Sequence, residues 1–203
     1  MKPAAYYKVC LETLNPALPS AWSTIAEAYR GRAYHNLDHL GEMLGHLPRL
    51  SANLAPAAAP VFGFALIYHD VVYRAGRKDN EARSADLAVA ALRQAAASPA
   101  DQVRCRRLIM ATRNHEAETE EEAILVDLDL AVLARDPVGY DRYARAVRRE
   151  FRRFPAFLYR PGRRKALRHF LEKEYIYHTT TARKNWEEPA RENLERELRE
   201  LSR

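Results

Sequence analysis

PVFGFALIYHD, residues 60–70, contains the longest apolar stretch of the chain and ends on an adjacent histidine and aspartate. Proline suits the first turn of a helix, and the apolar run from Val61 to Tyr68 predicts a helix that is buried on most of its circumference. Burying Asp70 beside His69 is unfavourable unless a cation or several hydrogen-bond donors meet the carboxylate. The end of this helix is therefore the first candidate for a metal site.

Further helices are expected on both sides of this stretch. The chain has seven glycines among 203 residues, many Ala, Leu, Arg and Glu, and few runs of β-branched residues, a composition that favours helices. Capping residues, prolines and apolar periodicity mark the helix ends. The expected helices cover residues 21–30, 36–47, 60–68, 79–97, 99–115, 120–134, 140–154 and 162–175, and a final segment that contains Pro189. We expect an all-α fold of about ten helices.

Length and composition set further limits. A chain of 203 residues suits one domain with a real core, and no internal repeat or disordered linker divides it. The N-terminus has no signal-peptide pattern, and Val61–Tyr68 is too short to span a bilayer. Cys10 and Cys105 have no C-x-x-C spacing, so neither a disulfide framework nor a thiolate zinc site is indicated. We expect a cytoplasmic protein that does not associate with membranes.

The charge balance bears on the partners. The 33 basic and 27 acidic residues are interspersed and give a formal net charge of +6, which fits a small anionic substrate about as well as a nucleic acid. Arg145, Arg148, Arg149 and Arg152 share a helical stripe, which is either a solvated face or the mouth of a site for an anion or a nucleic acid. We favour a small anionic substrate over nucleic acid, and the sequence leaves homo-oligomer formation open.

Two more histidines occur in Tyr34-His35-Asn36-Leu37-Asp38-His39. If this segment is helical, His35 and His39 project from one face with their Cβ atoms about 5–6 Å apart, and that face can deliver an imidazole to an ion. The alternative is a polar turn in which Asn36 caps the helix that follows. Both interpretations stay open at this point.

Polar residues farther along the chain extend the candidate set. Asp127 and Asp129 alternate with leucines, and residues two positions apart do not share a helical face. At most one of them is expected to bind an ion directly, while the other orients it or accepts a hydrogen bond. His115 ends the preceding helix, where it is either a site residue or a cation stabilised by the helix C-terminus.

The order of these residues resembles a known family. His35, then His69-Asp70, then one aspartate at 127 or 129, all on expected helices, is similar to the HD superfamily of metal-dependent phosphohydrolases. One branch of that superfamily has five motifs that resemble this chain in order: YHNLxH at 34–39, YHDxVY at 68–73, NExxSA at 80–85, TxxH at 112–115 and DLDLAxL at 127–133. Shorter similarities extend the resemblance to about residue 200. It implies a single HD-type helical bundle over residues 1–203, with the core motifs in 20–135 and the helices of 137–203 packed on that core.

The resemblance also implies a set of metal ligands, namely His35, His69, Asp70 and one late aspartate. Asp129 matches the second aspartate of the Asp-x-Asp runs common in related members and is preferred, with Asp127 beside it as a residue that orients the site. The cofactor would be a divalent ion such as Mn, Mg, Fe, Co, Ni or Zn. Some members bind a second ion through two histidines between the His-Asp pair and the last aspartate. This chain offers only His115 there, so one ion is the simpler expectation, although water or Glu81 could complete a second site.

The expected activity is hydrolysis of a phosphate ester in a nucleotide or phosphomonoester. An ion bound by imidazole and carboxylate lowers the pKa of a bound water from about 15.7 toward roughly 7. Asp70 and Glu81 are the catalytic candidates, and Glu81 is either a general base or a carboxylate favoured by a helix start. His39, Arg83 and His115 are candidates for binding the negative charge that develops on the phosphate.

Two other functions fit the same residues. Some HD-fold proteins use a di-iron centre to oxidise carbon with dioxygen, which requires more ligands than this sequence shows. A protein with the same fold could instead bind a nucleotide or nucleic acid without turnover. Metal content, oxygen uptake and sensitivity to chelators distinguish the three functions.

Overall fold

Helices make up the regular structure of this chain. The computed structural model describes residues 1–52 and 54–202, and within them it contains ten α-helices, two 3-10 helices and no β-strand. The helices are α1 (Pro3–Leu14), α2 (Trp22–Ala28), α3 (Leu37–Leu50), η1 (Pro56–Ala58), α4 (Ala59–Tyr68), α5 (Asn80–Gln94), α6 (Pro99–Asn114), α7 (Glu120–Leu130), η2 (Ala131–Ala134), α8 (Pro137–Glu150), α9 (Ala156–Leu171) and α10 (Thr180–Leu201). The all-α fold that we expected from the sequence is confirmed.

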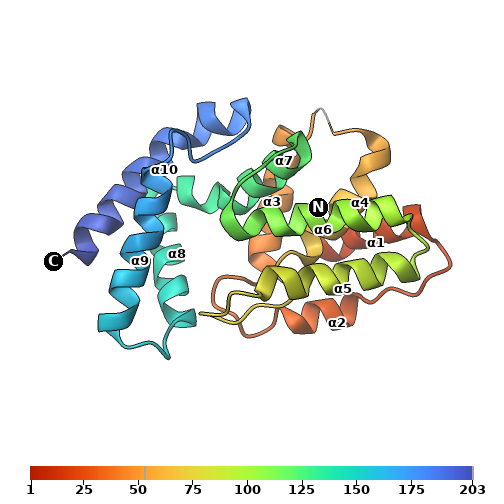
Figure 1. The fold of residues 1–203 in the computed structure, drawn as a ribbon, viewed down its shortest axis with the longest axis horizontal. Helices are drawn as coiled ribbons and strands as arrows, with labels where there is room; N and C mark the ends of the chain where they lie inside the picture. The colour runs from red at the N-terminus through yellow and green to blue at the C-terminus, as the bar shows by residue number, and fades with distance from the viewer. Residues whose placement is uncertain (53, 203) are drawn as a thin grey trace.

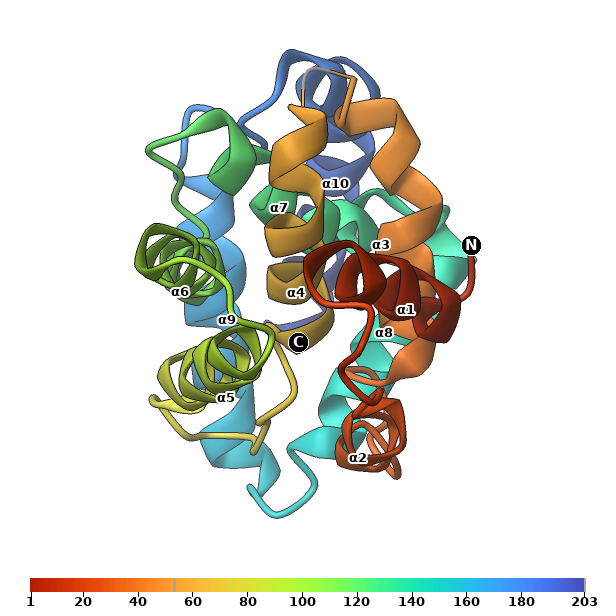
Figure 2. The same cartoon turned by 90° about the vertical axis from the view of Figure 1, so that its right-hand side faces the viewer.

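Helix α4 lies at the centre of the bundle, as its apolar sequence predicts. It contacts α1, α5 and α6, and Phe62, Phe64 and Leu66 are fully buried. Figure 2 shows α4 with α1 on one side and with α5 and α6 on the other. At Gly63 a Cβ atom would lie 2.3 Å from the Cys10 sulfur, so the glycine allows α1 to pack directly on α4. This packing fixes the position of the His-Asp pair that follows α4.

Helix α1 has no counterpart among the helices expected from the sequence. Its buried residues are Tyr7, Cys10 and Leu11, which lie three and four positions apart and therefore share one face. Charged Lys8 and Glu12 lie on its exposed side. The apolar face is short and interrupted by charged residues, which explains why it is weak as a sequence pattern.

Several helix ends differ from the expected positions, most of all in α9, which runs from Ala156 to Leu171 rather than over residues 162–175. Helix α3 continues through Pro48 to Leu50 rather than ending at residue 47, because a proline in the last turn removes only one helical hydrogen bond. Helix α8 ends at Glu150 rather than at residue 154. Beyond it, Arg148 donates hydrogen bonds to the carbonyl oxygens of Phe151 and Phe154, so a side chain satisfies backbone acceptors of this turn.

Helices α8, α9 and α10 form a group beside the N-terminal helices (Figure 1). Helix α10 contacts α9, α3 and η2. Asn193 of α10 donates hydrogen bonds to the carbonyl oxygens of Leu133 and Arg135, and Glu197 binds Arg163 and the Tyr140 hydroxyl. These contacts link the C-terminal group to the segment that follows α7, which carries one of the candidate ligands.

Two further findings concern the cysteines and the search for a membrane-spanning helix. Cys10 and Cys105 are both buried and are not joined in a disulfide. Within residues 1–52 and 54–202, no helix combines the length and the apolar character that are needed to cross a membrane. The longest helix, α10, carries many charged residues.

Candidate metal centre

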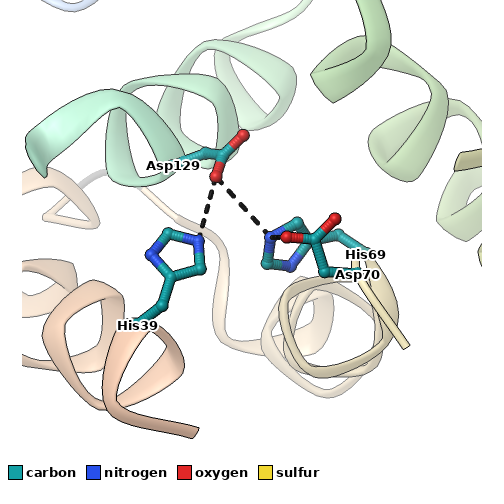
Figure 3. Close-up of side chains that lie close together, drawn as sticks. All are labelled: His39, His69, Asp70 and Asp129. Atoms are coloured by element: carbon teal, nitrogen blue, oxygen red, sulfur yellow. Dashed lines mark hydrogen bonds and ion pairs between the residues drawn. The ribbon is translucent and has the colours of Figure 1, made fainter. Parts of the chain in front are cut away.

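Four side chains that can bind a metal ion converge where α3, α4 and α7 meet. His39 comes from α3, His69 and Asp70 follow the last turn of α4, and Asp129 comes from α7. One ligand atom from each lies within 4.8 Å of the others, and no other such group of three or more residues occurs in the part of the chain that the structure describes. Figure 3 shows the Asp129 carboxylate facing both imidazoles. We call these four residues the metal cluster.

The His69 ring is oriented in the way that a metal ligand requires. Its Nδ1 lies 2.8 Å from the carbonyl oxygen of Leu66, and this contact places a proton on Nδ1. Its Nε2 is buried and makes no hydrogen bond, although Asp70 Oδ2 lies 3.2 Å away and Asp129 Oδ1 lies 3.6 Å away. A buried nitrogen that faces two carboxylates without a hydrogen bond fits a position beside a cation.

The spacing of the ligand atoms also suits one ion. Two donor atoms that each lie about 2.0–2.2 Å from an ion are at most about 4.4 Å from each other. His39 Nε2 lies 3.1 Å from Asp129 Oδ1, and one ligand atom from each of the four residues lies within 4.8 Å of the others, so the site would contract by about 0.4 Å at most around an ion. Two imidazoles and two carboxylates are a usual donor set for first-row divalent metals. The residues present therefore fit a divalent ion.

Electrostatics in the cluster favour charged groups. Burial acts to raise the pKa of Asp70, but His69 and His35 lower it to about 2. Burial likewise opposes the charge of Asp129, yet the neighbouring imidazoles of His115, His39 and His69 bring its pKa well below the ordinary value. For His69, burial acts to lower the pKa, and the charge of Asp70 together with Asp129 raises it well above 6.5. Both carboxylates therefore stay ionised at neutral pH and are available to a cation.

His39, which we expected to bind substrate, occupies the place in the cluster that the sequence analysis gave to His35. The reason is the start of α3. The side chain of Asn36 accepts hydrogen bonds from the backbone amides of Asp38 and His39 and caps the helix, so His35 precedes the helix and does not share a helical face with His39. Of the two interpretations left open, the structure shows the capped turn.

His35 lies beside the cluster and not within it. Its Nδ1 is 2.6 Å from Glu150 Oε2, and its ring stacks on Tyr73 at 3.8 Å between centroids. Glu150 Oε1 also accepts hydrogen bonds from the backbone amides of Tyr34 and His35. Burial acts to lower the pKa of His35, but Asp70 and Glu150 raise it overall. Its role as a ligand therefore stays a prediction, and its ring lies 6.3 Å from that of His39 between centroids.

Asp129 and Asp127 have separate surroundings, as the sequence analysis expected of residues two positions apart. Asp129 faces the histidines of the cluster, whereas Asp127 accepts hydrogen bonds from the backbone amides of His178 and Thr179 at 2.8 and 2.7 Å. The preference for Asp129 over Asp127 as the ligand agrees with this geometry. Asp127 holds the start of α10 and has no recorded contact with the ion-binding atoms.

His115 approaches the cluster from the end of α6. It adopts a left-handed backbone conformation with φ of 52°, and its Nε2 lies 3.5 Å from Asp129 Oδ2. Its carbonyl oxygen accepts hydrogen bonds from Lys173 and His178, which fix this turn. About a quarter of its side chain is exposed. His115 is therefore placed between the cluster and solvent, where a substrate group could reach it.

Glu81 and Arg83 are not brought to the cluster. Both lie in the first turns of α5, where Arg83 is exposed, and the structure records no hydrogen bond or ion pair from either side chain to the four cluster residues. Their neighbours Asn80 and Ser84 instead hold the loop after the His-Asp pair, because Asn80 pairs with the backbone of Arg74 and Ser84 with that of Val72. The NExxSA motif thus supports the cluster through the loop, and a catalytic role for Glu81 stays a prediction.

Three residues that support the cluster had no role in the sequence analysis. Arg32 donates hydrogen bonds to the carbonyl oxygens of Asp70 and Val71, acceptors that the end of α4 leaves unpaired. The Tyr34 hydroxyl lies 3.1 Å from His39 Nδ1 and orients that ring. Glu150 holds His35, as described above. Tyr34 lies in the YHNLxH motif and Glu150 lies in the stretch covered by the shorter similarities, but nothing in the sequence singled out Arg32.

Comparison of the chain with protein-family models, with curated proteins and with solved structures gives no match in any of the three. The similarity to the HD superfamily therefore depends on the motifs alone. The fold and the metal cluster described above are independent of that similarity.

Proposed function

We propose that this protein is a metal-dependent phosphohydrolase that cleaves a phosphate ester of a small anionic substrate, a nucleotide or a phosphomonoester. One observation supports this proposal above all others, namely the convergence of His39, His69, Asp70 and Asp129 from three helices on one point. A protein that only needed a stable core would not gather two ionised carboxylates and an unpaired imidazole nitrogen there. The motifs shared with the HD superfamily supply the reaction class.

The residues of the chain divide the expected tasks. The cluster would hold a divalent ion, which supplies Lewis-acid catalysis and lowers the pKa of water near the ester. Tyr34 and the Leu66 carbonyl orient His39 and His69 through their Nδ1 atoms. His115, partly exposed beside Asp129, would donate a hydrogen bond to a phosphate oxygen. Asp70 is ionised next to His69 and is the candidate for accepting a proton at its second oxygen.

The test combines metal analysis with turnover. We expect the protein purified without added metal to bind one divalent ion per chain, and to hydrolyse members of a panel of nucleotides and phosphomonoesters with Mn²⁺, Mg²⁺, Co²⁺ or Fe²⁺. His69→Ala and Asp70→Ala should abolish both properties. Asp38→Ala is the matched control, because Asp38 is exposed on α3 next to His39 and is not a member of the cluster.

The rival functions give different results in the same experiment. Two irons per chain with oxygen uptake on a substrate would replace the proposal with a di-iron oxygenase. Ligand binding that is indifferent to chelators, with no turnover for any metal, would replace it with a binding protein. Turnover that survives His69→Ala would contradict the assignment of the cluster.

A further inference from the structure

A second site candidate is lined by Tyr73 and Glu150, the two residues that hold the His35 ring. Residues 31–33, 73–75, 149–150 and 152–154 line a pocket of about 590 Å³, and we call it the arginine pocket. Its size is in the range of about 300–1,000 Å³ that is usual for sites of small molecules. Five arginines from three segments line it: Arg32, Arg74, Arg149, Arg152 and Arg153.

Most of this positive charge is not compensated by the protein. For Arg74, Arg149, Arg152 and Arg153 the structure records no ion pair and no side-chain hydrogen bond within the described residues, and all four are exposed. Other exposed arginines are unpaired as well, among them Arg142 and Arg145 of α8, but these two do not line the pocket. Four guanidinium groups around one hollow repel one another unless an anion lies between them.

The acidic residue in the lining, Glu150, does not neutralise these arginines. Both of its carboxylate oxygens are engaged, Oε2 by His35 and Oε1 by the backbone amides of Tyr34 and His35. Arg32 is engaged as well, because it donates to the carbonyl oxygens of Asp70 and Val71. The free hydrogen-bond donors of the pocket are therefore the other four guanidinium groups.

The walls of the pocket are fixed to each other and to the metal cluster. A Cβ atom on Gly76 would lie 2.7 Å from the Phe154 ring, so the loop after the His-Asp pair rests directly on the turn after α8. Asn80 holds the backbone of Arg74 within that loop. Tyr73 lines the pocket and stacks on His35, and Arg32 lines it and contacts the backbone of Asp70. Two lining residues thus connect the pocket to the cluster, Arg32 through the backbone of Asp70 and Tyr73 through the ring of His35.

We propose that the arginine pocket binds the phosphate groups of a small ligand that carries two or more phosphates. Guanidinium groups bind phosphate oxygens through charge-assisted, often bidentate hydrogen bonds, and several converging arginines select for a ligand with several phosphates. The assignment of this ligand as the substrate, with its distal phosphates in the pocket and its scissile phosphate at the cluster, rests on the proposed function. A small ligand is favoured over a nucleic acid because the four free arginines surround a hollow beside the cluster, rather than following an extended track.

The test measures binding of inorganic tripolyphosphate by calorimetry in the presence of EDTA, so that no metal contributes. We expect Arg149→Ala/Arg152→Ala to weaken binding at least about tenfold, because two charged hydrogen-bonding groups are lost. Arg142→Ala/Arg145→Ala is the matched control, since it removes two exposed arginines of α8 outside the pocket. Asp129→Asn should leave this binding intact, because it alters the cluster and not the pocket.

The outcomes separate the pocket from the proposed function. Suppose that Arg149→Ala/Arg152→Ala, the pocket variant, loses tripolyphosphate binding while Arg142→Ala/Arg145→Ala keeps it. This result establishes the pocket, even if no substrate is turned over with any metal. If turnover is found, the pocket variant should raise KM for a triphosphate substrate and leave that for a phosphomonoester unchanged. No binding by the wild type, or equal loss in both arginine pairs, would overturn the proposal. The proposal would also be overturned if a single-stranded oligonucleotide bound more tightly than tripolyphosphate through the same four arginines.

Discussion

Two aspartates on α7, two residues apart, have opposite electrostatic surroundings. Asp127 is fully buried and accepts hydrogen bonds from two backbone amides at the start of α10. Burial raises its pKa, and those hydrogen bonds offset the effect only in part. Asp129 faces His39, His69 and His115, and despite its burial these histidines hold its pKa well below the ordinary value. One carboxylate is thus satisfied by the backbone and the other by side chains that can be deprotonated.

This difference distinguishes a buried carboxylate that stabilises the fold, Asp127, from one that is available to a ligand, Asp129. Backbone amides are permanent donors that a metal ion cannot replace, so Asp127 is committed to holding α10. An imidazolium can lose its proton when a metal ion arrives, and the carboxylate beside it then binds the ion. The imidazolium partners of Asp129 can therefore be replaced by a metal ion, whereas the backbone amides that bind Asp127 cannot. The predictions below test this contrast, from the largest expected effect to the smallest.

Asp129→Asn should have the largest effect, on metal affinity and activity. Changes to residues that merely orient metal ligands lower metal affinity by about 10- to 100-fold, so loss of a ligand should exceed about 100-fold. Metal content after dialysis and turnover with saturating Mn²⁺ measure the effect. Circular dichroism should show an unchanged helix content. A variant that retains stoichiometric metal would contradict the role assigned to Asp129.

Asp127→Ala should act in the opposite way, on stability. It leaves the amides of His178 and Thr179 without an acceptor, and the loss of two hydrogen bonds to a charged group should lower the free energy of unfolding by about 3 kcal/mol. Urea denaturation of the metal-free protein measures this change. The folded fraction should still bind metal with the wild-type stoichiometry. If metal is lost while stability is kept, the contrast between the two aspartates is wrong.

The pH dependence of stability should reveal the proton of His69 that a metal ion would displace. The pKa of His69 in the folded protein lies well above 6.5, so its stabilising contribution is complete below about pH 6.5 and is lost as pH rises through the folded pKa. The metal-free protein should therefore lose stability above about pH 6.5, by at most about 1.4 kcal/mol per pH unit for this group. His35, whose pKa is also raised, contributes with the same sign.

A bound ion and a substitution provide the controls for that pH experiment. Because a divalent ion displaces the proton from His69, saturating Mn²⁺ should remove this loss of stability. His69→Gln should flatten the profile of the metal-free protein. Stability that stays constant between pH 6 and 9 in the metal-free wild type would show that His69 holds no such proton.

Tyr34→Phe should give the smallest effect. It removes the hydroxyl that orients His39 through Nδ1 and leaves the ring of Tyr34 in place, so metal affinity should fall up to about tenfold. Competition with a fluorescent chelator measures this change. Tyr143→Phe is a suitable control, because Tyr143 packs against the Tyr34 ring without contacting His39. Equal effects of the two variants would argue against an orienting role.

The sequence predicted the parts of this molecule that depend on local patterns. The apolar run before His69-Asp70 correctly indicated a central buried helix, and the alternation around Asp127 and Asp129 correctly indicated two separate environments. The helix cap at Asn36 was one of two open interpretations, and choosing between them required the backbone path of residues 34–39. That choice decides whether His35 or His39 enters the cluster.

Other features depend on contacts between distant segments, which no local pattern encodes. Arg32 reaches the end of α4 from 38 positions away along the chain, and Glu150 reaches His35 across 115 positions. Helix α1 was missed because only its packing on Gly63 and its neighbours stabilises so short an apolar face. Glu81 and Arg83 were chosen for their residue type, but the loop between Asp70 and α5 places them away from the cluster.

The metal cluster has one more consequence, for the order of events during synthesis. His39 and Asp129 are separated by 90 positions, so the cluster is incomplete until α7 has left the ribosome and docked on α3 and α4. A nascent chain that ends before α7 carries the paired histidine and aspartate of α4 without their partner carboxylate. Any ion that the cluster binds can therefore meet all four donors only after most of the chain has been translated.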